Sequence, residues 1–385
     1  MNDPQIVVVA NDVVPGMGLP VAAPGLRAYG LAEGLRHHGF EVTTVVDRGP
    51  LRSLQPDGVP PAMPPGTFVV DAAGMGDFVA GRAPAVVVLT NSNQIDRLRP
   101  VPGLHLVLDF FAPKMLELAC NPHRQGRDRA LATLRERKLR AIAAADGFIV
   151  NGAKKVPYFL AWLLQAGRDP LATPLEVVFM GVPAHFPTAP PASEGVRFAV
   201  AGYLQGWSLP GPWLDLLAAR LDPPRVTLDV LLPVHWGQRP LGEAPDRHLG
   251  MLAGRPGVTR HGAMPYEAFV GFMGRADVAV DLFARTLERE YAVVTRSVVA
   301  LACGVPVVHP PFTEVSPLVA AYDAGWLVDP EDPKAVEAVF AEIIGHPEAV
   351  AAKAANARRL WQEALDPAVT TAPLARLARR LAAGG

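Results

Sequence analysis

Two arginines and two glutamates lie within six positions of the chain, at a place that suits the binding of an anionic ligand. Residues 285–290, Arg-Thr-Leu-Glu-Arg-Glu, follow an apolar run at 277–283. Arg296 comes next, in the first turn of a helix that we expect to begin near Thr295. A helix N-terminus offers unpaired N–H groups and partial positive charge, so it favours phosphate. The alternative is a solvent-exposed loop with internal salt bridges.

Arg296 needs an anionic partner, because a cation in the first turn of a helix is unfavourable against the helix dipole. The candidates are Glu288 and Glu290 of the loop, or the diphosphate of a ligand. The planar guanidinium of arginine suits bidentate binding of phosphate. We therefore take Glu288, Arg289 and Arg296 as candidate site residues.

The elements around this loop follow from the sequence pattern. The run 277–283 is typical of a strand that is covered on both faces. Thr295 is a candidate N-cap, and Gly304 a candidate left-handed residue at the end of the helix. A second strand is predicted at 305–309. In open α/β sheets, ligands bind outside the carboxyl ends of the strands.

Asp109 is a second candidate for chemistry, in the first half of the chain. The apolar run within 105–113 places it at the carboxyl end of a predicted strand. A carboxylate there orients a polar ligand or a cation; the alternative is that it caps the following helix. Earlier in the chain, the strand 6–10, the glycine-rich loop 11–24 and the helix 25–38 predict the start of a doubly wound domain.

These segments resemble motifs of retaining glycosyltransferases of family 4, which have the GT-B fold. Residues 286–306 are similar to a bacterial subgroup motif of the form H-L-E-T-R-Y-A-F-R-T-R-V-L-D-Y-L-W-A-G-L-P. Two departures matter: Thr286 stands at the first histidine, and Val299 at a carboxylate that holds the donor ribose in many relatives. The matching residues are Leu287, Glu288, Tyr291, Ala292, Thr295, Arg296, Val298, Leu301, Gly304 and Pro306.

Other segments extend the resemblance over most of the chain. Residues 109–117 are similar to the subgroup motif D-L-Y-D-P-x-x-L-E, with Ala112 at its second aspartate. Residues 24–27 match the end of a G-G-P-G-L-R opening, and 181–183 match the G-V-P that closes the first domain. The turn at 202–207 corresponds to a G-G-I-W-D-W-x-D-P segment but lacks the Arg and Lys that clamp the diphosphate in many relatives.

The resemblance implies a set of site residues. His261 is a candidate contact to the nucleobase, or else a histidine satisfied within the protein. Tyr266 either stacks on the base or anchors the helix 266–274 in the core. The catalytic candidates are Asp109, Glu288 and Arg296. The donor-binding candidates are Gly202, Tyr203, Gly206, Trp207, His261, Tyr266, Arg289 and Thr295, and the acceptor-side candidates are Gly16, Gly18, Gly25 and Asn91.

The predicted fold is α/β, with two Rossmann-like domains that face each other across a cleft. Residues 1–183 form the acceptor-side domain, and 184–195, rich in proline, form the linker. Residues 196–365 form the domain that binds the nucleotide sugar. A last helix within 366–385 is expected to pack back on the first domain. The function implied is sugar transfer from a nucleotide-sugar donor to a hydroxyl or amine of a small-molecule or glycan acceptor, with retention of configuration.

The amino-acid composition argues against several classes of function. A net charge of −1 and 19% charged residues provide no field to hold nucleic acid. Two cysteines make no disulfide framework, so a reducing cytosol is expected. We expect no signal peptide, no transmembrane helix, no metal site and no bound cofactor, while peripheral membrane contact stays open. An inactive GT-B subunit that binds nucleotide or a partner enzyme, motivated by Val299 and Ala112, and a sugar-nucleotide epimerase remain as alternative functions.

Overall fold

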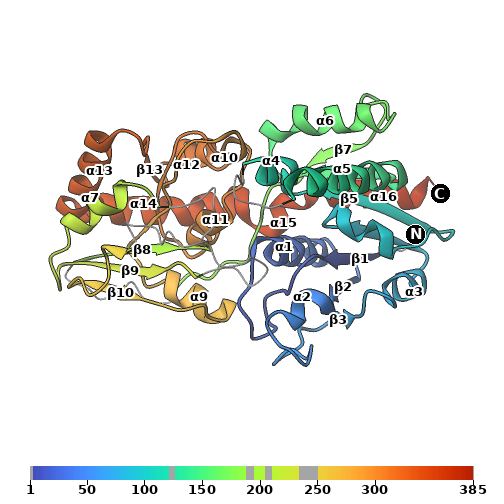
Figure 1. Cartoon of the computed structure of the whole chain (residues 1–385), viewed down its shortest axis with the longest axis horizontal. Helices are drawn as coiled ribbons and strands as arrows, with labels where there is room; N and C mark the ends of the chain where they lie inside the picture. Colours follow the sequence, from blue (N-terminus) through green and yellow to red (C-terminus); the bar gives the residue numbers. More distant parts are fainter. Residues whose placement is uncertain (1–2, 121–125, 188–194, 204–209, 234–249, 385) are drawn as a thin grey trace. The chain divides into compact units, whose positions relative to one another are not determined.

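The chain divides into two compact units, each built on one parallel sheet (Figure 1). The computed structural model describes residues 3–120, 126–187, 195–203, 210–233 and 250–384. Unit 1 contains residues 1–183 and 365–385, and unit 2 contains residues 184–364. Each sheet is covered by helices that connect its strands, as in doubly wound folds. The predicted fold class, two Rossmann-like α/β domains, is confirmed. Residues 188–194 of the predicted linker lie outside the described residues.

Unit 1 has seven parallel strands in the order β3-β2-β1-β4-β5-β6-β7. The order reverses between β1 and β4, which is the switch point where such sheets bind ligands. The strands are β1 (Gln5–Ala10), β2 (Val42–Asp47), β3 (Thr67–Val70), β4 (Ala85–Leu89), β5 (Leu104–Phe110), β6 (Gly147–Val150) and β7 (Leu175–Val177). The helices are α1 (Ala23–His37), α2 (Arg48–Arg52), α3 (Met75–Ala80), η1 (Ser92–Arg97), α4 (Lys114–Ala119), α5 (Arg127–Ala144), η2 (Ala153–Lys155), α6 (Val156–Gln165), α15 (Pro367–Thr370) and α16 (Ala372–Ala383).

The sheet of unit 1 has a hydrophobic layer on each face. Helices α3, α5 and α6 share one core cluster with alternate residues of the strands, among them Val7, Val9 and Phe148. Helix α1 contacts β1 and β2, and α16 contacts β4, β6 and β7. Side chains of a strand point alternately to its two faces, so apolar runs such as 6–10 are buried on both.

Unit 2 has six parallel strands in the order β10-β9-β8-β11-β12-β13, and its switch point lies between β8 and β11. The strands are β8 (Val196–Ala201), β9 (Val226–Leu231), β10 (Val258–Arg260), β11 (Val278–Val280), β12 (Val307–His309) and β13 (Gly325–Leu327). The helices are α7 (Trp213–Ala219), α9 (Tyr266–Met273), α10 (Leu287–Glu290), α11 (Thr295–Ala302), α12 (Ser316–Tyr322), α13 (Pro333–Gly345) and α14 (Pro347–Leu360). A π-helical turn, Trp361–Leu365, follows α14.

The boundaries near the charged loop differ in detail from those expected. The strand predicted at 277–283 is shorter, since β11 ends at Val280. Thr295 is the first residue of α11 and does not cap it; the N-cap position is Val294, and no side chain caps this end. Gly304 has a φ of 73°, which confirms the predicted left-handed end.

The first turn of α1 lies directly on the loop that follows β1. A Cβ added at Gly25 would lie 1.8 Å from the carbonyl oxygen of Val13. One added at Gly30 would lie 2.0 Å from the carbonyl oxygen of Gly181. Both positions therefore need glycine for the close approach of two backbone segments.

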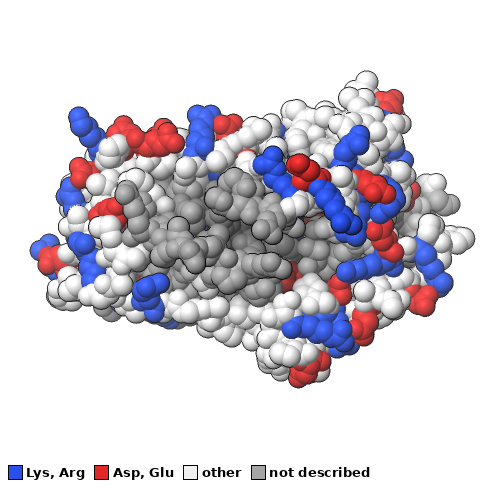
Figure 2. Space-filling model, viewed as in Figure 1, with Lys and Arg blue, Asp and Glu red and all other residues white. Residues whose placement is uncertain are grey.

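Charged side chains of both signs are intermixed over the described part of the face in Figure 2. This agrees with the net charge of −1. Among the described residues, no helix is both long enough and apolar enough to cross a membrane.

We predict that Gly25→Ala destabilises unit 1, because the added methyl group overlaps the Val13 carbonyl. Overpacking of this kind costs about 1–3 kcal/mol, which lowers the melting temperature by roughly 2–12 °C. The matched control is Gly74→Ala in the same unit, whose Cβ would meet only ordinary contacts at 3.7 Å and beyond. Thermal unfolding of both variants, followed by circular dichroism, checks this. Equal melting temperatures for the two variants would contradict it.

Candidate functional site

Residues at the carboxyl ends of three neighbouring strands of unit 2 lie close to Arg296 or are linked to it by hydrogen bonds. Gly202 follows β8, Asp281 follows β11, and His309 ends β12. Arg296 lies in the first turn of α11, and its guanidinium passes close to the backbone of Gly202. A Cβ at Gly202 would lie 2.4 Å from Nη1 of Arg296, so the absence of a side chain makes room for the guanidinium. The structure thus brings Gly202, Thr295 and Arg296 together at the switch point of the sheet.

The anionic partner of Arg296 is Asp281. Arg296 Nε donates to Asp281 Oδ1, and Ser297 Oγ donates to Asp281 Oδ2 at 2.5 Å. The expectation of Glu288 or Glu290 was therefore wrong. Asp281 directly follows β11, and its carboxylate reaches the Arg296 guanidinium in the first turn of α11. Its negative charge also compensates the positive end of the helix.

The charged loop forms its own ion pairs. Arg289 donates to Glu288 Oε1 at 2.8 Å, and Arg285 Nε donates to Glu290 Oε1 at 2.7 Å. The internal salt bridges of the alternative interpretation are present, but the loop is not simply solvent-exposed, because Glu288 is only 1% exposed. The Arg289 guanidinium lies 5.1 Å from the centre of the Phe283 ring. Glu288 and Arg289 are therefore paired with each other, and Arg289 also packs against Phe283.

A chain of hydroxyl groups continues from Asp281 into the interior, which the sequence did not suggest. Ser297 Oγ is 3.1 Å from His309 Nδ1, and His309 Nε2 is 2.7 Å from Thr313 Oγ1. Thr313 Oγ1 is 3.0 Å from Ser316 Oγ, which donates to the Pro310 carbonyl at 2.7 Å. His309, Thr313 and Ser316 are buried. The only signal in the sequence was a histidine at the end of a predicted strand.

The hydrogen atoms available to this series of hydrogen bonds can be counted. A neutral His309 has one N–H, and the three hydroxyl groups have one proton each, so four protons serve the five contacts from Asp281 to the Pro310 carbonyl. One contact therefore lacks a hydrogen. Ser297 donates its hydrogen bond to Asp281, so Nδ1 of His309 carries the hydrogen of the neutral ring and Nε2 is an acceptor. The single hydrogen of the Thr313 hydroxyl can go either to Nε2 of His309 or to Ser316 Oγ.

Burial keeps His309 neutral. Desolvation lowers the pKa of His309 from 6.5 to about 4, although the negative charge of Asp281 acts in the opposite direction. At neutral pH the imidazole is therefore an uncharged part of the hydrogen-bonded interior.

We predict that His309 makes the stability of the protein depend on pH. The folded state disfavours the proton, so the contribution of His309 is complete above pH 6.5 and is lost as the pH falls toward 4. The loss approaches ~3 kcal/mol. Urea unfolding between these pH values measures it. His309→Asn is expected to have a shallower pH dependence, and the exposed His346→Asn the wild-type one. Equal slopes for both variants would exclude His309 as the source.

Two further candidates of unit 2, His261 and Tyr266, contact other side chains of the same unit. His261 Nε2 lies 2.8 Å from Asp229 Oδ1, and the imidazole meets the Phe272 ring edge-on. Tyr266 is 3% exposed and begins α9, with its ring packed against His185. This favours the core anchor over stacking for Tyr266. Tyr203 is half-buried just after β8. Gly206 and Trp207 lie outside the described residues.

In unit 1, Asp109 forms a buried ion pair with Arg27. Arg27 Nε and Nη2 donate to the two carboxylate oxygens at 2.8 and 3.1 Å. Arg27 Nη1 also donates to the carbonyls of Val178 and Phe179, each at 2.9 Å. Burial raises the pKa of Asp109, and Arg27 opposes this. Asp109 does not cap α4, whose N-cap position is Pro113 with no side-chain cap. The capping alternative is therefore wrong.

We predict that Asp109→Asn destabilises unit 1 by about 3–5 kcal/mol, because it leaves the buried Arg27 guanidinium without its counter-charge. The double variant Arg27→Met with Asp109→Leu removes both charges, so it is expected to lose less. Urea unfolding of both proteins makes the comparison. A single variant as stable as the wild type would show that the ion pair does not stabilise the fold.

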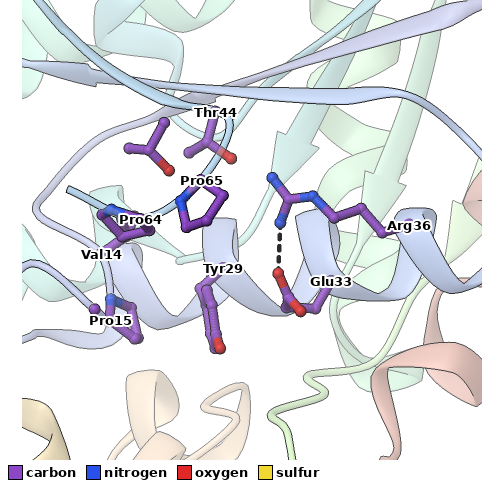
Figure 3. A pocket seen from close by; sticks show the side chains of 10 residues that line it. Val14, Pro15, Tyr29, Glu33, Arg36, Thr44, Pro64 and Pro65 are labelled. Carbon is purple, nitrogen blue, oxygen red and sulfur yellow. Dashed lines mark hydrogen bonds and ion pairs between the residues drawn. The ribbon is translucent and has the colours of Figure 1, made fainter.

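The glycine-rich loop borders a cavity of about 330 Å³ (Figure 3). Gly16 lies on its rim with a φ of 86°, and a Cβ there would meet Pro64 at 2.8 Å. Tyr29, Glu33 and Arg36 of α1 line this cavity, and Figure 3 shows Glu33 and Arg36 paired with each other. Of the acceptor-side candidates, Gly16 is the one that lines it.

The remaining acceptor-side candidates have structural contacts. Gly18 has a φ of 71° and lies near Pro61. Asn91 follows β4 and caps η1, because its side chain accepts from the Asn93 N–H at 2.8 Å. Within the described ranges, no group of three or more His, Cys, Asp or Glu side chains is arranged to hold a metal ion.

The fold is similar over its whole length to solved glycosyltransferases. Sucrose-phosphate synthase from Thermosynechococcus elongatus matches with a TM-score of 0.63 and 16% identity, covering 99% of this chain and 100% of that one. Anabaena Alr3699/HepE in complex with UDP and glucose matches with a TM-score of 0.62 and 15% identity, with the same coverage. WaaG, a glycosyltransferase involved in lipopolysaccharide biosynthesis, matches with a TM-score of 0.65 and 12% identity, again covering 99% and 100%.

The chain has the GT-B fold. The predicted resemblance to GT-B glycosyltransferases is confirmed at the level of the fold. No protein-family model matches the sequence, and no curated protein matches it. The fold is therefore recognised from the structure, at sequence identities of 12–16%.

Proposed function

We propose that the protein is a glycosyltransferase that moves a sugar from a nucleotide-sugar donor to an acceptor, with retention of configuration. The observation that carries the proposal is the position of Arg296, beside the Gly202 turn and at the N-terminus of α11, within a chain of GT-B fold. A solved structure of the same fold is a complex with UDP-glucose, so UDP is the nucleotide that we propose first.

In this proposal unit 2 binds the diphosphate. Arg296 Nε donates to Asp281, and the planar guanidinium of arginine suits the binding of phosphate oxygens. The side chain is 19% exposed, so a ligand can reach it. Asp281 fixes the direction of the guanidinium, and Glu288 does the same for Arg289. Preorganised cations of this kind stabilise the diphosphate as it leaves the sugar.

The acceptor then binds in unit 1, beside the loop of Gly16, Gly18 and Gly25. Asp109 supports this unit through Arg27, and its proposed role near the sugar or acceptor is to position backbone and side chains at the end of β5. The two cysteines, Cys120 and Cys303, are both unpaired, which is compatible with the proposed cytosolic location.

We predict that Arg296→Ala weakens binding of UDP by about 1.5–3 kcal/mol, or roughly 10–150-fold in Kd, and binding of uridine much less. Arg296→Lys is expected to recover part of the loss, since lysine cannot form a bidentate contact. The control is Arg285→Ala in the same loop, a side chain that is 63% exposed. Calorimetric titrations of UDP, GDP, ADP and uridine into the three variants and the wild type measure this.

The outcomes separate the possible functions. Equal losses for UDP and uridine would mean that Arg296 is only a structural partner of Asp281. Release of UDP from UDP-glucose without acceptor supports a transferase, because many transferases hydrolyse their donor slowly. UDP binding without any release would favour an inactive nucleotide-binding subunit. Proton NMR of a transfer product would test retention of configuration.

A further inference from the structure

Asp281 divides its two carboxylate oxygens between two neighbouring residues of α11. Oδ1 accepts from Arg296 Nε, and Oδ2 accepts from Ser297 Oγ at 2.5 Å. The first turn of the helix therefore offers the same carboxylate a cation and a hydroxyl group. Asp281 is 6% exposed and Ser297 is 1% exposed, so water has little access to the bond between them. A hydrogen bond to a charged group is among the stronger ones in a protein.

The ion pair of unit 1 shows the other way in which these two residue types pair. Asp109 gives both oxygens to one arginine: Arg27 Nε donates to Oδ2 at 2.8 Å, and Nη2 donates to Oδ1 at 3.1 Å. This bidentate geometry is frequent between arginine and carboxylates. Asp281 departs from it, because Ser297 holds the second oxygen and Arg296 receives the first.

The hydroxyl group of Ser297 is itself fixed in direction. His309 Nδ1 lies 3.1 Å from Ser297 Oγ, and the hydrogen on Nδ1 leaves the hydroxyl hydrogen for Asp281. Ser297 and His309 are both buried. A carboxylate otherwise turns easily about its last bond, since that torsion has only broad minima. Ser297 is therefore the group that stops Asp281 from turning its second oxygen toward the guanidinium.

The number of oxygens that Asp281 gives to Arg296 determines how strongly this carboxylate competes with another anion. A bidentate pair occupies one edge of the guanidinium in the geometry that a phosphate group also uses. A pair through one oxygen competes less. The Arg296 side chain is 19% exposed, so the way in which it is paired affects what a ligand meets.

We propose that Ser297 is a positioning residue for the binding of a nucleotide diphosphate. By holding Oδ2 of Asp281, it limits this carboxylate to one oxygen on Arg296 and so weakens the competition between Asp281 and the diphosphate. The inference rests on the proposed function, in which Arg296 binds the diphosphate. It adds a residue that acts through Asp281 and not by touching the ligand. In Ser297→Ala, Asp281 is free to give both oxygens to Arg296, the geometry already present in unit 1.

Calorimetric titration of UDP and uridine tests this with a matched pair of variants. Ser297→Ala removes the hydroxyl group that holds Asp281. Ser316→Ala removes an equally buried hydroxyl group at the far end of the same series of hydrogen bonds, where Ser316 Oγ donates to the Pro310 carbonyl. Ser297→Ala should weaken UDP binding about tenfold, and Ser316→Ala less than about twofold. Uridine has no diphosphate, so its affinity should be the same in both variants and the wild type.

A second background separates positioning from general damage to the fold. The amide of Asp281→Asn has one acceptor oxygen, so it cannot form a two-oxygen pair with Arg296 whether or not Ser297 is present. Adding Ser297→Ala to this variant should therefore change UDP affinity less than about twofold. A hydroxyl group that only stabilised the helix would cause the same loss in both backgrounds.

A crystal structure of Ser297→Ala gives a readout that needs no nucleotide. We expect both oxygens of Asp281 to contact the Arg296 guanidinium. A contact through one oxygen, as in the wild type, would overturn the inference. The same holds for UDP affinity as high in Ser297→Ala as in Ser316→Ala, and for an equal loss with and without Asp281→Asn.

The inference and the proposed function can fail separately. If the wild type binds UDP and Ser297→Ala binds it equally well, the inference fails and the proposed transferase stands. If the wild type binds no nucleotide, the proposed transferase fails, and with it the effect on diphosphate binding. A two-oxygen pair in the structure of Ser297→Ala would in that case still support the role of Ser297 in holding Asp281.

Discussion

The ion pair between Arg27 and Asp109 holds together three segments of unit 1 that are far apart in the sequence. Arg27 comes from α1, Asp109 from the end of β5, and the carbonyls of Val178 and Phe179 from the segment after β7. All of this lies in the interior, where neither charge has access to water. The loops at this edge of the sheet are therefore built on a charge pair that is stable only when both partners are present.

Unit 2 repeats the same arrangement with a different degree of exposure. Asp281 directly follows β11 and pairs with Arg296 of α11, as Asp109 near the end of β5 pairs with Arg27 of α1. The side chain of Arg27 is 1% exposed and that of Arg296 is 19% exposed. Only the second arginine is therefore in contact with solvent. The same chemical pair is thus fully enclosed in unit 1 and partly accessible to solvent in unit 2.

The sequence was sufficient to predict those structural features that depend on a local pattern of residues. Apolar runs marked the parallel strands, and Gly304 marked the end of α11. The ion-pair partner of each charged side chain was harder to predict, because it depends on which strand ends lie side by side. Asp281 was hidden inside a run interpreted as a strand, and its contact with Arg296 spans 15 positions. The burial of Glu288 likewise depends on packing that charge density alone does not reveal.

Unit 1 is assembled from two stretches of the chain, with the whole of unit 2 between them. On the ribosome, β1 to β7 are therefore made first, and α16 emerges only after residues 184–364. At about 5–20 residues per second this delay lasts roughly 10 s or more. During that time the face of the sheet that receives Leu374 and Leu377 lacks its cover. A nascent chain must therefore carry this apolar surface until α16 is synthesised.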